Sequence, residues 1–330
     1  MTRCQMWPAL WAAFLLLGVE VTVSKKDGLQ SSNFDRFVYV DVGANWGNTA
    51  GLWRVLGSDR LPDTDMTDLP WEVYLFEAAP MMWPYLDRLT EHLNGNGPLP
   101  KAPLPTGGST PTTVKHFAGH YNCTTAQDKF DCIFRRVNPI MQDLLHDSSK
   151  WARYNTSELR QQRLAMAQQP TTGSVRYTLI PAAAGADNEW LRLMWGTKSL
   201  LRGGGTAVKR KEGVAETSIY NVHAVDLPAW LEHNFGHATG HKTFLIFKMD
   251  IEGAEFYIMP KLLNLMAHKR ISLAGFAWEC HHRFIQNGRA ECLELGREVS
   301  RHTTLFKEKA HYKDFDTEAQ PWLKHVQVPK

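Results

Sequence analysis

The segment Val38–Thr49 constrains the fold most strongly, because it reads as a strand running into a tight turn. Its apolar run stops at Asp41, and Gly43 and Gly47 follow with Asn45 between them. In α/β proteins a strand, a turn of small residues and a helix N-terminus together form a site for a nucleotide-like ligand. The spacing Asp-x-Gly-x-x-x-Gly differs from the Gly-x-Gly-x-x-Gly fingerprint of dinucleotide-binding proteins. A nicotinamide-dependent dehydrogenase is therefore a weaker interpretation of this turn.

Strands and helices are expected to alternate along the rest of the chain. Further strands are predicted at 72–76, 175–180, 220–225, 243–249 and 273–278, and helices near 49–55, 81–89 and 227–235. This alternation predicts an α/β, Rossmann-like fold with a mostly parallel sheet and helices on both faces. A helical insertion after the second strand, at 94–172, interrupts the pattern, with helices expected at 129–146 and 157–168. It either forms a lid over a substrate or decorates the surface.

The composition is that of a globular protein with a sizeable core. The chain has 330 residues, of which 43% are hydrophobic. Its formal net charge of +3 at pH 7 is too small to indicate binding to nucleic acid or to a membrane surface.

The first 24 residues have the pattern of a secretory signal peptide. Arg3 precedes an apolar run from Met6 to Val19, and small residues follow near Ser24. The run is short for the ~20 residues of a membrane span, and Glu20 interrupts it. We therefore expect a mature chain of 25–330, in the lumen of the ER or Golgi or outside the cell, with no stable membrane insertion. An uncleaved membrane anchor is the alternative.

Cysteine usage agrees with an oxidising compartment. Removal of the signal leaves an even number of cysteines, namely Cys123, Cys132, Cys280 and Cys292. Sequence proximity favours the pairs Cys123–Cys132 and Cys280–Cys292, although three connectivities exist and four buried thiols are the alternative. The tripeptides that begin at Asn122 and Asn155 are N-glycosylation acceptors, which suits a secretory protein.

Polar side chains come at or just after the ends of four predicted strands. They are Asp41, Glu77, Asp250 and Glu279 with His281. The carboxyl ends of parallel strands line the ligand crevice of an open α/β sheet, so we expect these groups to lie together. Each of them alone is equally compatible with a helix cap or a solvated surface residue.

These positions predict a division of roles at the crevice. Backbone N–H groups of the Gly43–Gly47 turn would face a ligand carboxylate, because glycine has no Cβ there. Glu77 would accept both hydroxyls of a ribose, and the small residues 182–185 would leave room for an adenine ring. Asp250 follows a deeply buried strand, where a carboxylate needs a partner, and strand alternation makes Lys248 the predicted partner.

Three segments together resemble the FkbM family of S-adenosylmethionine-dependent methyltransferases. They are DVGANWGNT at 41–49, YLFEAAP at 74–80 and FKMDIEGAEFYIM at 247–259. AAAGADN at 182–188 and WECHH at 278–282 are similar to later segments of that family. The family's Phe-Glu-Pro becomes FEAAP here, which shifts the proline but keeps the acid.

The resemblance implies that S-adenosylmethionine binds at the crevice and that a hydroxyl of a glycan or small natural product is methylated. The implied cofactor-binding residues are Asp41, Gly43, Asn45, Gly47, Glu77 and Ala184. An alcohol needs a base to take its proton, and the expected catalytic residues are Asp250, then His281, with Glu252 beside them. A metal ion held by Asp250 and His281 could do the same job, but no complete set of metal ligands is evident, so no metal is predicted.

A catalytically silent relative is the main alternative function. A methyltransferase in a secretory lumen needs imported cofactor, whereas a secreted Rossmann-like glycoprotein that binds a glycan or a protein does not. Asp41, Glu77 and Asp250 favour catalysis, because a silent protein does not need charged groups at a ligand edge.

Overall fold

The computed structural model describes residues 29–45, 47, 49–100, 147–195, 205–206, 219–282, 285–303 and 305–308. The predicted signal peptide, the expected helix at 129–146, the Cys123–Cys132 pair and the acceptor Asn122 lie outside these residues. The described part confirms the predicted α/β, Rossmann-like fold.

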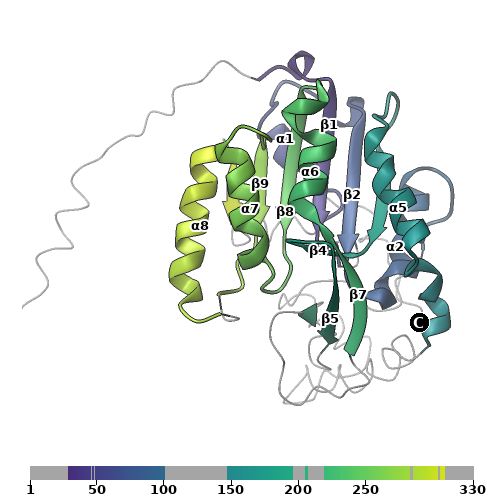
Figure 1. The fold of residues 1–330 in the computed structure, drawn as a ribbon. Helices are drawn as coiled ribbons and strands as arrows, with labels where there is room; N and C mark the ends of the chain where they lie inside the picture. Colours follow the sequence, from purple (N-terminus) through teal and green to yellow (C-terminus); the bar gives the residue numbers. More distant parts are fainter. Residues whose placement is uncertain are drawn as a thin grey trace, which may run out of the picture.

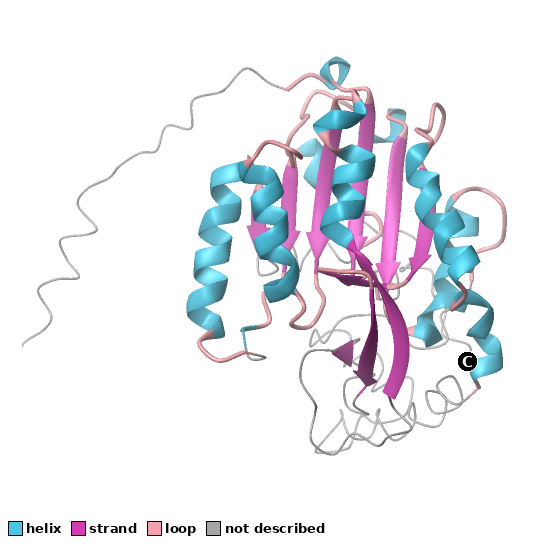
Figure 2. Cartoon of the chain, viewed as in Figure 1, coloured by secondary structure: helices cyan, strands magenta, loops and turns pink. Residues whose placement is uncertain are grey.

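Six parallel strands of the described residues form the main sheet (Figures 1 and 2). In spatial order they are β10 (Phe306–Glu308), β9 (Gly275–Trp278), β8 (Thr243–Met249), β1 (Arg36–Val42), β2 (Trp71–Glu77) and β3 (Arg176–Pro181). Counting only these strands along the chain, the order from β3 is 3-2-1-4-5-6, as in doubly wound nucleotide-binding folds. The order reverses between β1 and β8, so the ligand crevice is expected at the carboxyl ends of these two strands.

Helices cover both faces of this sheet. They are α1 (Leu52–Ser58), α2 (Trp83–Leu93), α5 (Ser157–Ala165), α6 (Leu227–Phe235), α7 (Glu255–Ala267) and α8 (Gly288–His302). In β1, Phe37 and Tyr39 pack in the core that α1 and α2 cover, whereas Val38 and Val40 pack in the core under α6, α7 and α8. Successive side chains of a strand point to opposite faces, so β1 is buried on both sides.

A second, smaller sheet projects from the carboxyl edge of the main sheet (Figure 1). Its order is β4 (Ala183–Gly185), β7 (Ile219–Asp226), β5 (Glu189–Trp195) and β6 (Gly205–Thr206). The predicted strand at 220–225 is β7, but it pairs with β4 and β5 and not with the main sheet. The sequence analysis does not predict β5. Hydrophobic periodicity identifies a strand without identifying its neighbours.

The described part of the predicted insertion contains the helix expected at 157–168. It consists of α5 and a following 3-10 turn, Met166–Gln168. Thr156 caps α5, because its Oγ1 accepts a hydrogen bond from the backbone N–H of Leu159 at 3.2 Å. The predicted glycosylation acceptor Asn155 therefore directly precedes a helix cap.

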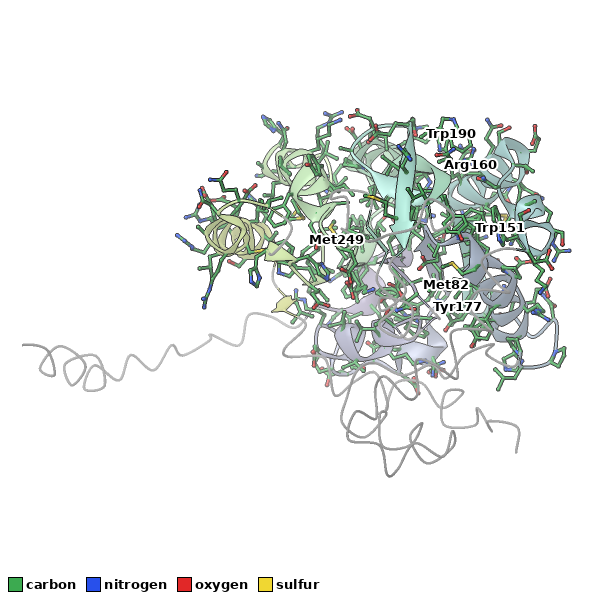
Figure 3. All side chains as sticks on the ribbon, turned by 90° about the horizontal axis from the view of Figure 1, so that it is seen from below. Met82, Trp151, Arg160, Tyr177, Trp190 and Met249 are labelled. Carbon is green, nitrogen blue, oxygen red and sulfur yellow. A yellow bond between two sulfur atoms is a disulfide. The ribbon has the colours of Figure 1, made fainter. Side chains whose placement is uncertain are left out.

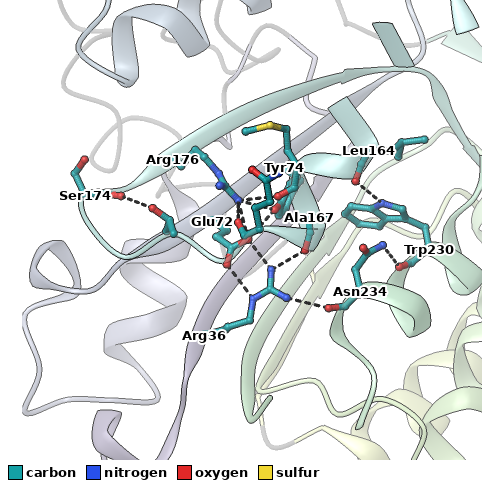
Figure 4. Close-up of polar contacts among 12 residues, drawn as sticks. Arg36, Glu72, Tyr74, Leu164, Ala167, Ser174, Arg176, Trp230 and Asn234 are labelled. Carbon is teal, nitrogen blue, oxygen red and sulfur yellow. Dashed lines mark hydrogen bonds and ion pairs between the residues drawn. The ribbon is translucent and has the colours of Figure 1, made fainter. Parts of the chain in front are cut away.

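A buried ionic network ties together the amino ends of β1, β2 and β3 (Figure 4). Arg36 donates from Nε and Nη2 to the two carboxylate oxygens of Glu72, at 2.9 and 2.7 Å. The Tyr74 hydroxyl donates to the same carboxylate at 2.7 Å, and Arg176 Nη2 donates to it at 3.1 Å. Arg36 also donates to the carbonyl oxygen of Asn234 in α6 at 3.0 Å. The network lies at the end of the strands opposite the crevice, where it fixes the sheet.

Two further findings concern membrane spans and disulfides. Each helix in the described ranges is too short or too polar to cross a membrane. Cys280 and Cys292 form a disulfide with their Cα atoms 6.0 Å apart, which confirms this predicted pair.

Candidate functional site

The candidate site lies where β1 and β8 end, at the lower edge of the sheet in Figure 1. Figure 3 looks at this edge from below, and Met249 marks the end of β8. Backbone hydrogen bonds continue beyond the strands, from Asp250 N to Val42 O at 2.9 Å and from Glu279 N to Met249 O at 3.0 Å. The segments that follow β1, β8 and β9 are therefore held side by side.

A buried ion pair lies beneath the first turn. Lys248 Nζ is 3.0 Å from Asp41 Oδ1, and the two side chains are 2% and 0% exposed. The register explains the contact, because Asp41 of β1 lies directly beside Lys248 of β8. Lys248 also donates to the carbonyl oxygen of Gly43 at 2.8 Å, and Asp41 Oδ2 accepts from Thr49 Oγ1 at 2.7 Å. Both side chains thus hold the turn that follows β1.

This pair corrects one expectation from the sequence. Lys248 pairs with Asp41 and not with Asp250, because β8 ends before Asp250 and strand alternation no longer applies there. Asp41 is completely buried and holds the first turn, and its predicted contact with a cofactor stays a prediction.

The first turn uses its backbone amides inside the protein. The N–H groups of Gly43 and Ala44 donate to the carbonyl oxygen of Phe76 at 3.0 and 2.9 Å, and Gly47 N donates to Ala44 O at 2.8 Å. These three amides are therefore already used within the protein, and the contact of the turn with a ligand carboxylate stays a prediction. The glycines allow a close approach instead, since a Cβ on Gly43 would lie 1.9 Å from the carbonyl oxygen of Asp250. Both glycines also have positive φ, +81° and +80°.

Glu77 ends β2 beside this turn and is 6% exposed. The backbone N–H of Asn45 donates to its Oε2 at 2.6 Å, and that of Ala79 donates to its Oε1 at 2.8 Å. Burial raises the pKa of Glu77 to about 7, while these two hydrogen bonds act in the opposite direction. A carboxylate oxygen has two lone pairs, so each oxygen keeps one further acceptor position, as a pair of ribose hydroxyls requires.

Asn45 has two features that single it out within the turn. Its φ is +53°, a left-handed conformation that asparagine tolerates better than most residues. Its Oδ1 is buried and has no hydrogen-bond partner among the described residues. A buried acceptor without a donor is unfavourable by about 1–3 kcal/mol, so this oxygen fits a donor group on a ligand.

The segment after β8 carries a strained acidic residue. Glu252 has a φ of +51°, which is unfavourable by about 1–2 kcal/mol for a residue with a Cβ. In this conformation Glu252 Oε1 lies 3.5 Å from His281 Nε2, and Asp250 Oδ1 lies 3.6 Å from the same nitrogen. Backbone strain of this kind concentrates at functional sites.

His281 is the centre of a group that we name the His281 cluster, together with Asp250, Glu252 and Glu279. The histidine is 5% exposed, and its Nδ1 is hydrogen bonded to Glu255 Oε1 at 2.5 Å. The backbone N–H of His281 donates to the same oxygen at 3.1 Å. Glu255 is completely buried at the first residue of α7, so it fixes the ring. Nε2 then faces the other three acids at 3.5–3.9 Å.

The surroundings of His281 also set its charge. Burial by itself lowers the pKa of the imidazole, but the hydrogen bond and the charge of Glu255, with the charges of Asp250 and Glu252, raise it to about 9. The neighbouring acids therefore favour the protonated form of the ring, which makes His281 a weaker candidate for a general base than the acids beside it. Asp250 and Glu252 remain as candidates to accept a proton.

Ala184 lies in β4 and packs in the core together with Val225 of β7. Ala182, Ala183 and Ala184 are all buried. These small residues allow close packing of the second sheet against the first, and the expected space for an adenine ring stays a prediction.

Glu255 and Glu279 are absent from the catalytic residues predicted from the sequence. The sequence places Glu279 at the sheet edge without a role. In the structure its carboxylate and the side chains of Asp250 and His281 each offer one possible ligand atom, and these three atoms lie within 4.8 Å of one another. The only sequence signal for a functional role of Glu255 is its position as the last acid of the segment at 247–259. Its contact with a histidine 26 positions later depends on the fold and cannot be read from local sequence.

Comparison with protein-family models, with curated proteins and with solved structures finds no match to this chain. The resemblance to the FkbM family therefore remains a prediction from the motifs quoted above.

Proposed function

We propose that the protein is an S-adenosylmethionine-dependent methyltransferase that acts on a hydroxyl of a glycan or small natural product. The observation that carries this proposal is a continuous set of contacts across the switch point between β1 and β8. Glu77 accepts a hydrogen bond from Asn45, and two residues earlier in the same turn Gly43 packs against the backbone of Asp250. One sheet edge thus joins a nucleotide-binding type of turn to a cluster of groups that accept protons.

The side chains at the first turn fit the polar groups of this cofactor. Glu77 would hold the ribose hydroxyls through its remaining acceptor positions. The buried Oδ1 of Asn45 would accept a hydrogen bond from the amino group of the amino-acid tail. When bound, S-adenosylmethionine supplies a methyl group on a positively charged sulfur, whose carbon–sulfur bond breaks as the new carbon–oxygen bond forms.

The residues of the opposite side of the crevice would prepare the acceptor. Asp250, whose side chain is 21% exposed, is the first candidate to accept the proton of the acceptor hydroxyl. Glu252 is the second, at 18% exposure. A positioned base contributes ~10²–10⁴-fold in rate, and fixing both reactants in line contributes up to ~7–11 kcal/mol. The protein's main task is therefore positioning.

We also propose that the protein works in the secretory pathway. The Cys280–Cys292 disulfide supports this compartment, because such bonds are rare in the cytosol. The signal peptide and the glycans on Asn122 and Asn155 are parts of the same proposal. Mass spectrometry of the protein purified from its own cells, before and after glycosidase treatment, tests all three.

A binding-only function is the second candidate, and two observations favour it. The amides of Gly43 and Ala44 are already used within the protein. Trp190 on β5 is 61% exposed (Figure 3), and its ring meets that of His223 edge-on with centroids 5.5 Å apart. An exposed aromatic face of this type is suited to stacking against a sugar ring.

A methyl-transfer screen separates the two candidates. The mature chain, 25–330, is incubated with tritiated S-adenosylmethionine and a panel of glycans and small alcohols. Wild type should transfer the label, and Asp250→Asn should abolish transfer while cofactor affinity stays within a few-fold. Glu298→Gln, at a partly exposed acid on α8 paired with Arg301, is the matched control and should transfer normally. Undiminished transfer by Asp250→Asn would remove Asp250 from the mechanism, and glycan binding with neither cofactor binding nor transfer would establish the binding-only function.

A further inference from the structure

The His281 cluster combines donor atoms of the kind that hold a metal ion. His281 Nε2 and the carboxylates of Asp250 and Glu279 offer three ligand atoms that all lie within 4.8 Å of one another. They come from two segments that are far apart in the sequence and meet at the carboxyl edge of the sheet. We infer that these three residues bind a divalent transition-metal ion, with Glu252 as a fourth acid at its side.

The distances in the cluster are slightly longer than those between the ligands of one bound ion. His281 Nε2 lies 3.6 Å from Asp250 Oδ1, 3.5 Å from Glu252 Oε1 and 3.9 Å from Glu279 Oε2. Ligand atoms that are about 2.1 Å from one ion lie roughly 3.0–3.4 Å from each other. Small rotations of the two carboxylate side chains therefore suffice to close the site around an ion.

Glu255 supplies the orientation that a metal-binding histidine needs. Its carboxylate is hydrogen bonded to Nδ1 of the His281 ring, so Nε2 points into the cluster. Histidines that bind metals commonly donate their second N–H to a carboxylate or carbonyl oxygen in this way. Glu255 is completely buried, and its carboxylate also accepts hydrogen bonds from the backbone N–H groups of Gly253 and His281. The ring is therefore fixed before any ion binds.

The main chain of the cluster is fixed as well. Asp250 N donates a hydrogen bond to Val42 O of β1, and Glu279 N donates one to Met249 O of β8. Cys280 stands between Glu279 and His281, and its disulfide to Cys292 attaches this segment to α8. Ligands on a rigid framework lose little freedom when they bind an ion.

The donor set indicates which ion binds. Imidazole nitrogen favours zinc and similar transition metals, whereas carboxylate oxygens also suit manganese. Magnesium and calcium take oxygen ligands and gain little from a histidine. One nitrogen with two or three carboxylates therefore points to Mn²⁺ or Zn²⁺.

The role of the ion rests on the proposed methyltransferase function. An ion bound to the acceptor oxygen withdraws electron density and eases the loss of the hydroxyl proton. When an ion engages Asp250 and His281 as ligands, Glu252, the second candidate base, accepts this proton in place of Asp250. The oxygen then forms its bond to the methyl carbon, the carbon–sulfur bond breaks, and its electron pair stays on sulfur as a neutral thioether.

Direct metal binding tests the inference without any methyl donor. The full chain is stripped with a chelator and titrated with Mn²⁺ while electron paramagnetic resonance follows the free ion, and with Zn²⁺ in a calorimeter. Wild type should bind one ion, and Glu279→Gln should weaken binding at least tenfold. Glu298→Gln is the matched control, since Glu298 is a similarly exposed acid on α8 outside the cluster, and it should bind as wild type does.

Glu255→Gln distinguishes a positioning residue from a purely structural one. Glu255→Gln should weaken Mn²⁺ binding ~10–100-fold. If this variant does not fold, Glu279→Gln, at a partly exposed side chain, still tests the metal site. Absence of bound Mn²⁺ and Zn²⁺ in folded wild type, or equal binding by Glu279→Gln and Glu298→Gln, would overturn the inference. Metal binding without uptake of S-adenosylmethionine would keep the metal site and overturn the proposed function. Full methyl transfer by chelated, metal-free protein would keep the proposed function and overturn the inferred metal site.

Discussion

Lys248 Nζ and Asp41 Oδ1 lie 3.0 Å apart at the ends of two neighbouring parallel strands, almost completely shielded from solvent. The ammonium group neutralises the carboxylate beneath the first turn and also holds the carbonyl oxygen of Gly43. Asp250, two residues after this lysine, instead joins the His281 cluster. The crevice thus keeps a structural ion pair separate from the acids that we propose for chemistry.

Replacing Lys248 with Met should lower the free energy of unfolding by about 3–5 kcal/mol, because Asp41 would stay buried without its cation. The double variant Lys248→Met with Asp41→Asn should recover part of this loss. Urea denaturation measures both. Lys261→Met, at a 46% exposed ion pair, is the control and should change stability by less than about 1 kcal/mol. An equally small change at Lys248 would contradict the buried pair.

Arg36→Met should destabilise the protein more than Arg176→Met. Arg36 is 2% exposed and binds both carboxylate oxygens of Glu72, whereas Arg176 is 20% exposed and reaches one of them. We expect losses of about 3–5 kcal/mol and about 1–3 kcal/mol. Chemical denaturation of the two variants side by side checks the order, and a larger loss for Arg176→Met would refute this account of the network.

Glu77 should make the folded protein less stable as the pH rises from 4.5 to about 7. In this window the unfolded chain ionises Glu77 while burial keeps it protonated in the folded protein, so the folded state binds more protons. The free energy of unfolding then falls by on the order of 3 kcal/mol, and this group contributes no further change above that window. Glu77→Gln removes the contribution. Denaturation of wild type and variant across this pH range measures it, and parallel profiles would show that Glu77 does not titrate in this way.

Glu252→Gly should be more stable than Glu252→Ala by about 1–2 kcal/mol, because only alanine keeps the penalty of a positive φ. Both variants lose the same carboxylate, so their difference isolates the backbone strain. Thermal denaturation of the pair provides the measurement. Equal stability would mean that Glu252 does not have the left-handed conformation in solution.

Removing the disulfide with Cys280→Ser and Cys292→Ser should reduce stability by about 3 kcal/mol, since the bond closes a short loop of the unfolded chain. It should also weaken Mn²⁺ binding, because Cys280 lies between two proposed ligands. Reduction of wild type should reproduce both effects. Unchanged Mn²⁺ affinity would show that the disulfide does not organise the His281 cluster.

Local signals made much of the fold predictable. The helix expected at 227–235 has these bounds because Asp226 caps it, Pro228 suits its first turn and Gly236 follows its end. The strands at 37–42 and 243–249 were equally clear, since continuous apolar runs of this length are typical of buried parallel strands.

Long-range relationships were not predictable. The pairing of Lys248 with Asp41 depends on the register of two strands about 200 residues apart in the chain. The assignment of β7 to a second sheet depends on β5, which has only a weak local pattern. The contact between Glu255 and His281 depends on how α7 packs beside the end of β9, so the sequence located the acids but not the cluster that they form.

The most direct test of the account is calorimetric titration of the folded mature chain with S-adenosylmethionine. Wild type should bind one molecule saturably, with binding at least tenfold weaker in Glu77→Gln and unchanged in Glu298→Gln, at a partly exposed acid on α8. Folded wild-type protein that takes up no S-adenosylmethionine, with or without Mn²⁺, would contradict the account.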